Sequence, residues 1–192
     1  MRKNLRFCCI LWLVSVLFGG CSDAVVTDDD TQQEVATVAV HEGLLAIEHH
    51  LDNMDRGDHD FMTGYHSALV VDPHANDYKR GDVVYFAVPE KVGEMTISRI
   101  VALPGEEIAI KAGQVYIDGN ELKTFYGREY HTGQWVEKSE VHLEKMRIPE
   151  GHYFVLGDNW WRSHDSKQFG PLAEEHIKGK VLGYKQSPSA TR

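Results

Sequence analysis

The chain carries Asp82-Val83-Val84-Tyr85-Phe86-Ala87-Val88, a β-branched and aromatic run that Pro89 ends. A second run of this kind spans residues 96–103 and stops at Pro104-Gly105. β-Branched and aromatic side chains fit a pleated, half-buried surface, and proline interrupts the hydrogen-bond ladder of a sheet. The two runs therefore predict two strands of a mainly β domain.

The pattern continues on both sides of these runs. Lys111-Ala112-Gly113 lies between two apolar segments and predicts a hairpin with glycine in its turn. Only residues 171–177 are typical of a helix, with proline near the start. Residues 123–147 are polar and are interpreted as an excursion from the β core. The other predicted strands are 69–71, 107–110, 114–117, 152–156 and 181–184.

The N-terminus has the layout of an export signal. Arg2, Lys3 and Arg6 form a basic head, followed by an apolar run over residues 7–18. That run is shorter than the roughly 20 apolar residues that cross a bilayer, and small residues follow it. A buried N-terminal helix is the alternative, but no polar face interrupts the run. The stretch Leu17-Phe18-Gly19-Gly20-Cys21 resembles a lipobox, which implies lipidation of Cys21.

Composition and charge narrow the function classes. The 192 residues are 42% hydrophobic and 10% aromatic, which is sufficient for one domain with a core. The formal net charge of −9 argues against binding to nucleic acid, which needs a basic face. All three cysteines lie in or at the end of the signal, so no disulfide is expected in the mature protein.

We predict four parts: a lipoprotein signal peptide over 1–20, an acidic tether over 21–34, a β domain over 35–186 and a tail over 187–192. Asp28-Asp29-Asp30 makes the tether polar and self-repelling, so it is expected to be extended and solvated. Removal of residues 1–20 takes away three basic residues and no acidic one, which changes the net charge to −12. Anionic lipid headgroups would repel such a body, so the lipid anchor must hold it at the membrane.

Three polar-flanked segments follow one another along the chain. They are Arg80-Gly81-Asp82-Val83-Val84-Tyr85-Phe86, Ser98-Arg99-Ile100-Val101-Ala102-Leu103-Pro104-Gly105-Glu106, and Gly157-Asp158-Asn159-Trp160-Trp161-Arg162-Ser163-His164-Asp165-Ser166-Lys167. In this order they resemble the conserved boxes of type I signal peptidases, over about residues 44–184. This resemblance implies a signal-peptidase/LexA-like β fold with few short helices. It also implies a serine endopeptidase that processes signal peptides of exported proteins at the membrane surface.

The family uses a serine nucleophile and a neutral lysine that accepts its proton. The lysine stands directly before the arginine of the second box, but Ser98 precedes Arg99 here. Arg99 cannot replace the lysine, because a guanidinium stays protonated in proteins. Asn53-Met54 is the best match to the stretch that carries the nucleophile, which places an amide at that position. The resemblance therefore implies a degenerate dyad at Asn53 and Ser98, and leaves enzymatic activity open.

The third segment matches the family pattern better than the two dyad positions do. In the family, the serine that matches Ser163 helps to hold the lysine amine. The acid that matches Asp165 supports its loop through an arginine, which is Lys167 here. Exposed aromatic residues near the family's active site enter the lipid surface, which suggests membrane contact for Trp160 and Trp161; core packing is the alternative.

Residues 48–60 invite two further interpretations. Glu48, His49, His50, Asp52, Asp55 and the Asp58-His59-Asp60 run are metal-ligand types at close range. An EF-hand register fails, because Met54, Arg56 and Thr63 fall on ligand positions. We therefore interpret this segment as a polar loop and expect no metal and no other cofactor. Arg-Gly-Asp occurs at residues 56–58 and 80–82, where a turn is favoured over an adhesion motif.

Three functional hypotheses remain. The first is a signal-peptide endopeptidase, and the second is a non-catalytic lipoprotein that binds peptides by strand addition in the retained groove. The third is a different nucleophile–base pair, such as Ser67 with a histidine. The expected partners are signal peptides or extended segments of exported proteins, together with a membrane surface reached through the lipid anchor, and no nucleic acid. The expected location is extracytoplasmic.

Overall fold

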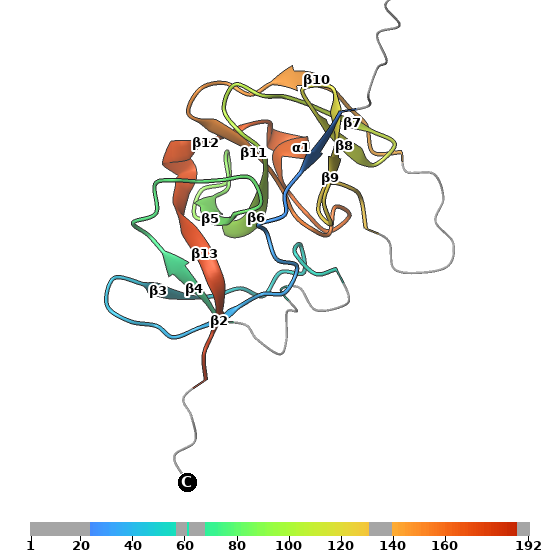
Figure 1. Cartoon of the computed structure of the whole chain (residues 1–192). Helices are drawn as coiled ribbons and strands as arrows, with labels where there is room; N and C mark the ends of the chain where they lie inside the picture. The colour runs from blue at the N-terminus through green and yellow to red at the C-terminus, as the bar shows by residue number, and fades with distance from the viewer. Residues whose placement is uncertain (1–23, 57–60, 62–67, 131–139, 188–192) are drawn as a thin grey trace, which may run out of the picture.

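The structure is a computed structural model, and it describes residues 24–56, 61, 68–130 and 140–187. Within these residues the protein is mainly β, with thirteen strands, one α-helix of four residues and one short 3-10 helix (Figure 1). The mainly β prediction is confirmed. No helix in the described part of the chain has the length and apolar character needed to span a membrane.

The larger sheet has eight strands. Its order is β12-β11-β6-β5-β13-β4-β3, and β2 pairs with β13 beside this path. Neighbouring strands along the path are antiparallel, whereas β2 runs parallel to β13. The bounds are β2 (Thr37–Val38), β3 (Leu45–Glu48), β4 (Ala68–Asp72), β5 (Val83–Ala87), β6 (Met95–Ala102), β11 (His152–Leu156), β12 (Leu172–Ala173) and β13 (Ile177–Lys185).

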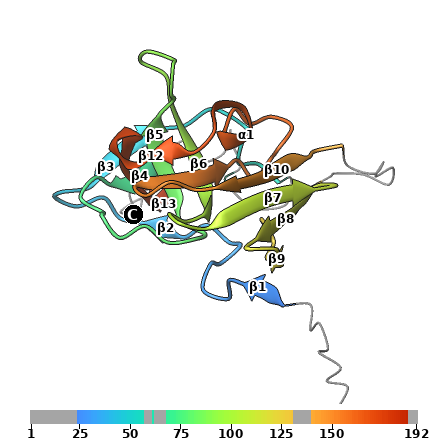
Figure 2. The same ribbon diagram turned by 90° about the horizontal axis from the view of Figure 1, so that it is seen from above.

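The smaller sheet has five strands in the order β1-β9-β8-β7-β10. It lies beside the larger sheet, with β1 at its outer edge (Figure 2). The strands are β1 (Val25–Thr27), β7 (Glu107–Lys111), β8 (Gln114–Ile117), β9 (Asn120–Lys123) and β10 (Leu143–Arg147).

Buried side chains divide into three clusters. One cluster joins the smaller sheet to β6 and β11, and it includes Ile110, Phe154 and Trp160. The other two lie on opposite faces of the larger sheet, since successive side chains of a strand point to opposite faces. Ile97 belongs to one of them and Ile100 to the other. Strand β6 therefore contributes to all three clusters and is the structural centre of the domain.

Each predicted strand has a counterpart in the structure, but the predicted helix is wrong and one helix was missed. The expected helix over residues 171–177 is instead β12 followed by the 3-10 helix Glu174–His176. Backbone pairing of Tyr153 with Leu172 overrides the local helix preference there. The only α-helix in the described residues, α1 (Ser166–Phe169), was not predicted.

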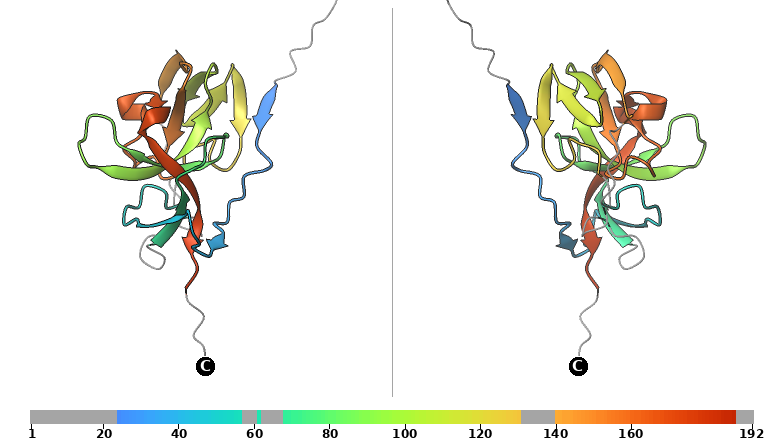
Figure 3. Two further views of the ribbon diagram at one scale, coloured as in Figure 1. Left: turned by 90° about the vertical axis from the view of Figure 1, so that its left-hand side faces the viewer. Right: turned by 90° about the vertical axis from the view of Figure 1, so that its right-hand side faces the viewer.

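The described part of the expected tether also differs from the prediction. Instead of a fully solvated chain, Val25–Thr27 forms β1, which pairs in parallel with β9. Thr37–Val38 then pairs with β13. Figure 3 shows this segment running down one side of the molecule from β1 to β2. The expected signal peptide over 1–20, Cys21 and the tail from residue 188 onward lie outside the described residues.

Candidate functional site

Asn53 lies at the centre of the candidate site, and it is only 3% exposed. Its Nδ2 donates to the backbone oxygen of Ile97 at 2.7 Å, beside Ser98 on β6. Its Oδ1 contacts Nε2 of His49 at 3.0 Å, and since an amide oxygen only accepts, this nitrogen carries the proton. Burial lowers the pKa of His49, although the bond to Asn53 acts in the opposite direction. The amide therefore ties the segment after β3 to the edge of β6.

The loop after β11 is tied to the same segment. The backbone oxygen of Asn53 accepts from the amide of Asn159 at 3.0 Å and from Oγ of Ser163 at 3.0 Å. Ser163 Oγ also contacts the backbone oxygen of Asn159 at 2.6 Å. A Cβ on Gly157 would lie 1.8 Å from Ser163 Oγ and 2.5 Å from the Asn53 oxygen, so only glycine permits this approach. The Ser163 hydroxyl thus faces backbone carbonyls.

Ser98 lies next to this junction but points into the domain. It pairs with Val84 on β5, and both Val84 and Ile100 belong to one buried cluster. Directly opposed side chains share a face of the sheet, so the Ser98 side chain faces that cluster. It is 0% exposed, and its hydroxyl has no hydrogen-bond partner among the described residues. The structure thus brings the Asn53 amide to the backbone next to Ser98, whereas the Ser98 hydroxyl faces the buried cluster.

Asp165 is completely buried and acts as the N-cap of α1. Its carboxylate accepts from the amide of Gly157 at 2.9 Å, which fixes the start of the loop. Nζ of Lys167 contacts both carboxylate oxygens, at 2.9 and 2.7 Å. The same ammonium lies 5.5 Å from the centre of the Trp160 ring. Asp165 therefore braces the loop, and a lysine performs the pairing that the family assigns to an arginine.

Arg99 forms a buried ion pair with Asp158. Two bonds join the side chains, Nε to Oδ1 at 2.9 Å and NH2 to Oδ2 at 2.6 Å. The guanidinium also donates to the backbone oxygen of Gly81 at 2.8 Å, and it lies over the rings of Phe125 and Tyr126. Arg99 thus connects β6 with the first and third family-like segments and with the two aromatic residues that follow β9.

A cleft of about 210 Å³ borders Asn53. Leu51, Val88 and Thr96 contribute apolar and hydroxyl surface to its walls. At its rim, Arg162 Nε pairs with Asp52 Oδ2 at 2.7 Å. The remaining lining residues are Glu94 and His164.

The two adjacent tryptophans occupy different environments. Trp160 is 3% exposed and packs in the cluster that joins the sheets, so its predicted membrane contact does not fit the structure. Trp161 is 63% exposed, and its membrane contact stays a prediction. The alternative of core packing therefore holds for Trp160.

The polar segment after β3 forms local contacts. His50 pairs with Glu48 at 3.3 Å, and both side chains are largely exposed. Among the described residues, no group of three or more histidine, cysteine or acidic side chains is arranged to hold a metal ion. Residues 58–60 and Ser67, which belong to the metal and alternative-nucleophile hypotheses, lie outside the described residues.

Comparison with known proteins identifies the family. A model described as "Signal peptidase, peptidase S26" matches residues 31–184. The chain belongs to this family. Signal peptidase I V of Bacillus subtilis is 34% identical over 124 residues, which are 59% of this chain and 71% of that protein. Probable signal peptidase I-1 of Synechocystis is 33% identical over 116 residues, which cover 57% of this chain and 55% of the relative.

The family also includes relatives described as inactive. Inactive signal peptidase IA of Staphylococcus aureus is 28% identical over 106 residues, which cover 55% of this chain and 59% of that protein. A solved signal peptidase I from Enterococcus faecalis has a TM-score of 0.43 and 30% identity, over 55% of this chain and 97% of that structure. The chain thus spans little more than half the length of several curated relatives.

Within this family framework, sequence reasoning missed His49, Asn159 and Arg162 as members of the site. His49 was considered only as a metal ligand, because its neighbours are ligand types. Its spacing of four residues from Asn53 was the available signal. Asn159 and Arg162 lie in the third box, but only the folded loop brings them to Asp52 and Asn53.

Proposed function

We propose that this member of the signal peptidase family lacks serine–lysine hydrolysis and binds extended segments of exported proteins. The observation that carries this proposal is the hydrogen bonding of Asn53. Its amide donates to Ile97 and accepts from His49, where the family resemblance implies a hydroxyl nucleophile. An amide has no hydroxyl to activate, and Ser98 has no amine that could accept a proton.

The neighbouring ammonium does not replace the missing base. Lys167 belongs to the third family-like segment, but its Nζ is held between the two oxygens of the buried Asp165 carboxylate. A general base must lie within reach of the nucleophile's proton, whereas this Nζ contacts the Asp165 carboxylate instead. Relatives described as inactive signal peptidases are consistent with loss of catalysis elsewhere in the family.

The edge of β6 supports peptide binding. Strand β11 pairs with β6 only as far as Leu156 opposite Arg99, so the first part of β6 extends beyond it. Glu94 and Thr96 bring this part of the chain to the cleft beside Asn53. An extended peptide could add there as a short strand, with one side chain against Leu51 and Val88. Asn53 already holds the Ile97 carbonyl, which limits how far such a strand could continue.

Binding and cleavage can be measured on one sample. The full chain in detergent micelles is titrated against a fluorescent signal peptide, and anisotropy and product formation are followed together. We expect saturable binding without cleavage. Leu51→Asp should weaken binding about tenfold, because it places a charge in the cleft wall. Leu45→Asp is the matched control, since Leu45 is 46% exposed on β3 and Leu51 is 48% exposed.

Three outcomes would overturn this proposal. Cleavage of the signal peptide by the wild-type chain would assign a peptidase with an unrecognised mechanism. An absence of saturable binding at millimolar peptide, or equal effects of the two leucine substitutions, would remove the peptide-binding function.

We also propose that the chain is exported and held at an extracytoplasmic membrane surface by a lipid on Cys21. The basic head, the short apolar run and the small residues before the cysteine support this proposal. Metabolic labelling with a radioactive fatty acid tests it. The wild-type chain should carry label and Cys21→Ser should not, while equal labelling of both would contradict the assignment.

A further inference from the structure

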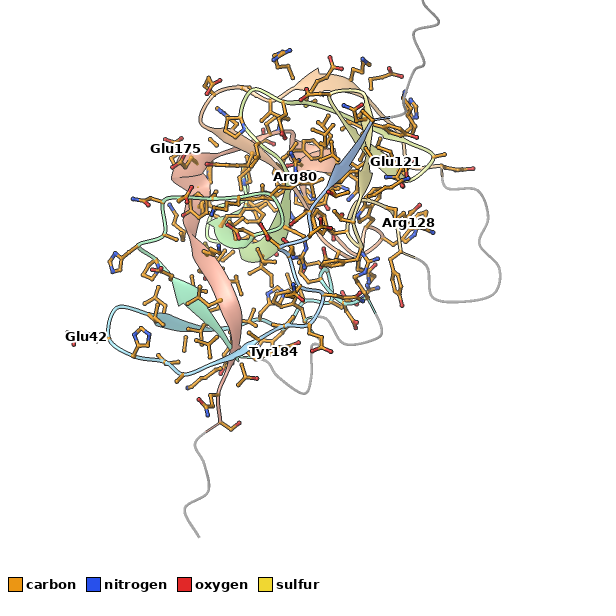
Figure 4. The ribbon with its side chains drawn as sticks, in the orientation of Figure 1. Glu42, Arg80, Glu121, Arg128, Glu175 and Tyr184 are labelled. Atoms are coloured by element: carbon orange, nitrogen blue, oxygen red, sulfur yellow. The ribbon has the colours of Figure 1, made fainter. Side chains whose placement is uncertain are left out.

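The segment from Ala24 to Val38 connects strand β9 of the smaller sheet with the end of β13 in the larger sheet, and we name it the strap. At one end, β1 pairs in parallel with Glu121–Lys123 of β9. At the other end, Thr37 pairs with Tyr184 of β13. Glu121 and Tyr184, labelled in Figure 4, mark these two ends, and Arg80 lies between them. Residues 24–30 precede the match to the family model, so this end of the strap lies outside the family domain.

The Asp28 carboxylate holds the middle of the strap in place through hydrogen bonds. Its Oδ1 accepts from the amides of Asp30 and Thr31, both at 3.1 Å. Its Oδ2 accepts from the Thr31 hydroxyl at 2.5 Å and from the Tyr126 hydroxyl at 2.5 Å. The last bond crosses from the strap to the domain, since Tyr126 is 1% exposed and belongs to the cluster that joins the sheets.

The Asp28 carboxylate and Thr31 lie directly against Gly81 of the domain, and we call this contact point the seat. A Cβ built on Gly81 would lie 1.8 Å from Thr31 Oγ1 and 2.5 Å from Asp28 Oδ2, and its φ of +89° also favours glycine. The seat is rigid, because the Gly81 carbonyl accepts from the buried guanidinium of Arg99. Tyr126 lies on the same guanidinium, with its ring centre 5.3 Å away.

The charge of Asp28 strengthens the hydrogen bonds that hold the strap against the domain. Burial acts to raise the pKa of Asp28, but hydrogen bonds from Thr31 and Tyr126 outweigh it, so the pKa lies below its usual 3.8. The carboxylate is therefore charged at neutral pH, and hydrogen bonds to a charged acceptor are about twice as strong as neutral ones. Burial, together with the bond to Asp28, raises the pKa of Tyr126, so its hydroxyl keeps the proton that it donates.

We propose that Asp28 is a latch that holds the strap on the domain and sets the reach of the N-terminal chain. In the closed state the strap is a fixed part of the fold. In the open state the eleven residues 24–34 form a free chain that can extend to about 37 Å and has a mean span of roughly 18 Å, while Thr37 and Val38 stay paired with β13. The repulsion among Asp28, Asp29, Asp30 and Glu34 favours extension once the latch opens. This inference is independent of peptide binding in the cleft.

The strap also covers a hollow of about 740 Å³. Strap residues from Thr27 to Ala36 form one wall, and Arg80, Gly81 and Lys180 contribute to the opposite wall. Opening of the latch would expose the edge of β9 and this wall together. The two states therefore differ in the accessible surface of the domain as well as in the reach of the chain.

Hydrogen exchange measured by mass spectrometry on the full chain tests the latch. We expect peptides that cover residues 24–34 to be protected in the wild type. Asp28→Ala should raise their exchange rate about tenfold or more, because it removes the bond from Tyr126 together with the bonds from Asp30 and Thr31 within the strap. Asp30→Ala is the matched control, since Asp30 lies on the same turn with an exposed side chain, and it should change the rate less than twofold.

Two further variants separate release of the latch from unfolding. Tyr126→Phe removes only the hydroxyl that crosses to the strap, and Gly81→Ala places a methyl group in the seat. Both should increase exchange over residues 24–34 while peptides of β5 and β6 keep their protection. Unprotected exchange of the strap in the wild type would overturn the proposal, as would equal effects of Asp28→Ala and Asp30→Ala.

Discussion

Asn53→Ala tests whether Asn53, which the family resemblance assigns to the nucleophile position, is a structural brace. The side chain is 3% exposed, and it joins Ile97 and His49 through two hydrogen bonds. Alanine would leave a buried carbonyl and a buried ring N–H without partners. Each unsatisfied group costs about 1–3 kcal/mol. We therefore expect a loss of about 2–5 kcal/mol in the free energy of unfolding, out of the roughly 5–15 kcal/mol typical of a domain.

Urea unfolding followed by tryptophan fluorescence measures this loss. The midpoint should fall while the slope m stays unchanged, because the surface exposed on unfolding is the same. Asn120→Ala is the matched control. The Asn120 amide makes only a 3.4 Å contact with the backbone of Asp118, so its removal should change stability by about 0.5 kcal/mol or less.

Asn53→Asp keeps the size and shape of the side chain but removes its hydrogen-bond donor. It keeps an acceptor for His49 but removes the donor to Ile97 and places a carboxylate in a buried position. The loss should match or exceed that of alanine, since burial of an unpaired charge is costly. If Asn53→Ala lost less than about 0.5 kcal/mol, equal to the control, the brace would be refuted.

Three further predictions follow from the same geometry. Asp158→Asn should destabilise the fold by about 3–5 kcal/mol, because it leaves a buried guanidinium unpaired; Asp52→Asn, at the exposed rim pair, should cost less than about 1 kcal/mol in the same urea assay. Because the pKa of His49 is lowered in the folded protein, the free energy of unfolding should fall as the pH drops below 6.5, by at most about 1.4 kcal/mol per pH unit. His49→Gln should flatten this pH dependence. A flat wild-type profile, or equal flattening by His50→Gln, would contradict the prediction. Trp161→Ser should weaken sedimentation with zwitterionic vesicles roughly tenfold, and unchanged partitioning would exclude membrane contact by this ring.

The sequence predicted the central strands well but missed the edges of the fold. Strands β5 and β6 can be predicted from their own residues, which are rich in β-branched and aromatic side chains and are followed by proline. By contrast, β1 and β2 are two or three residues long, in a polar segment. Their strand conformation comes from pairing with β9 and β13, which no local pattern reports. The wrong helix over 171–177 has the same origin, since pairing of β12 with β11 decides its conformation.

For the site, the sequence provided residue types but not their directions. It predicted that Asn53 and Ser98 depart from the family pattern, and the fold brings the amide of Asn53 to the backbone oxygen of Ile97, next to Ser98. It could not show that the Ser163 hydroxyl would face two carbonyls. It also could not show that one of two adjacent tryptophans would be buried, because a sharp loop sends the two rings in different directions.

The presence of the family-like segments does not by itself imply that the protein is catalytically active. Asp158 neutralises the buried charge of Arg99, and Asp165 caps α1 and holds the amide of Gly157. Each of these side chains is nearly or completely buried, so its loss would destabilise the fold whether or not a peptide bond is cut. Asn53 and Ser98 differ from these carboxylates, because their side chains carry no charge. A change at either position therefore leaves no buried charge without its partner, whereas loss of Asp158 removes the carboxylate that neutralises Arg99.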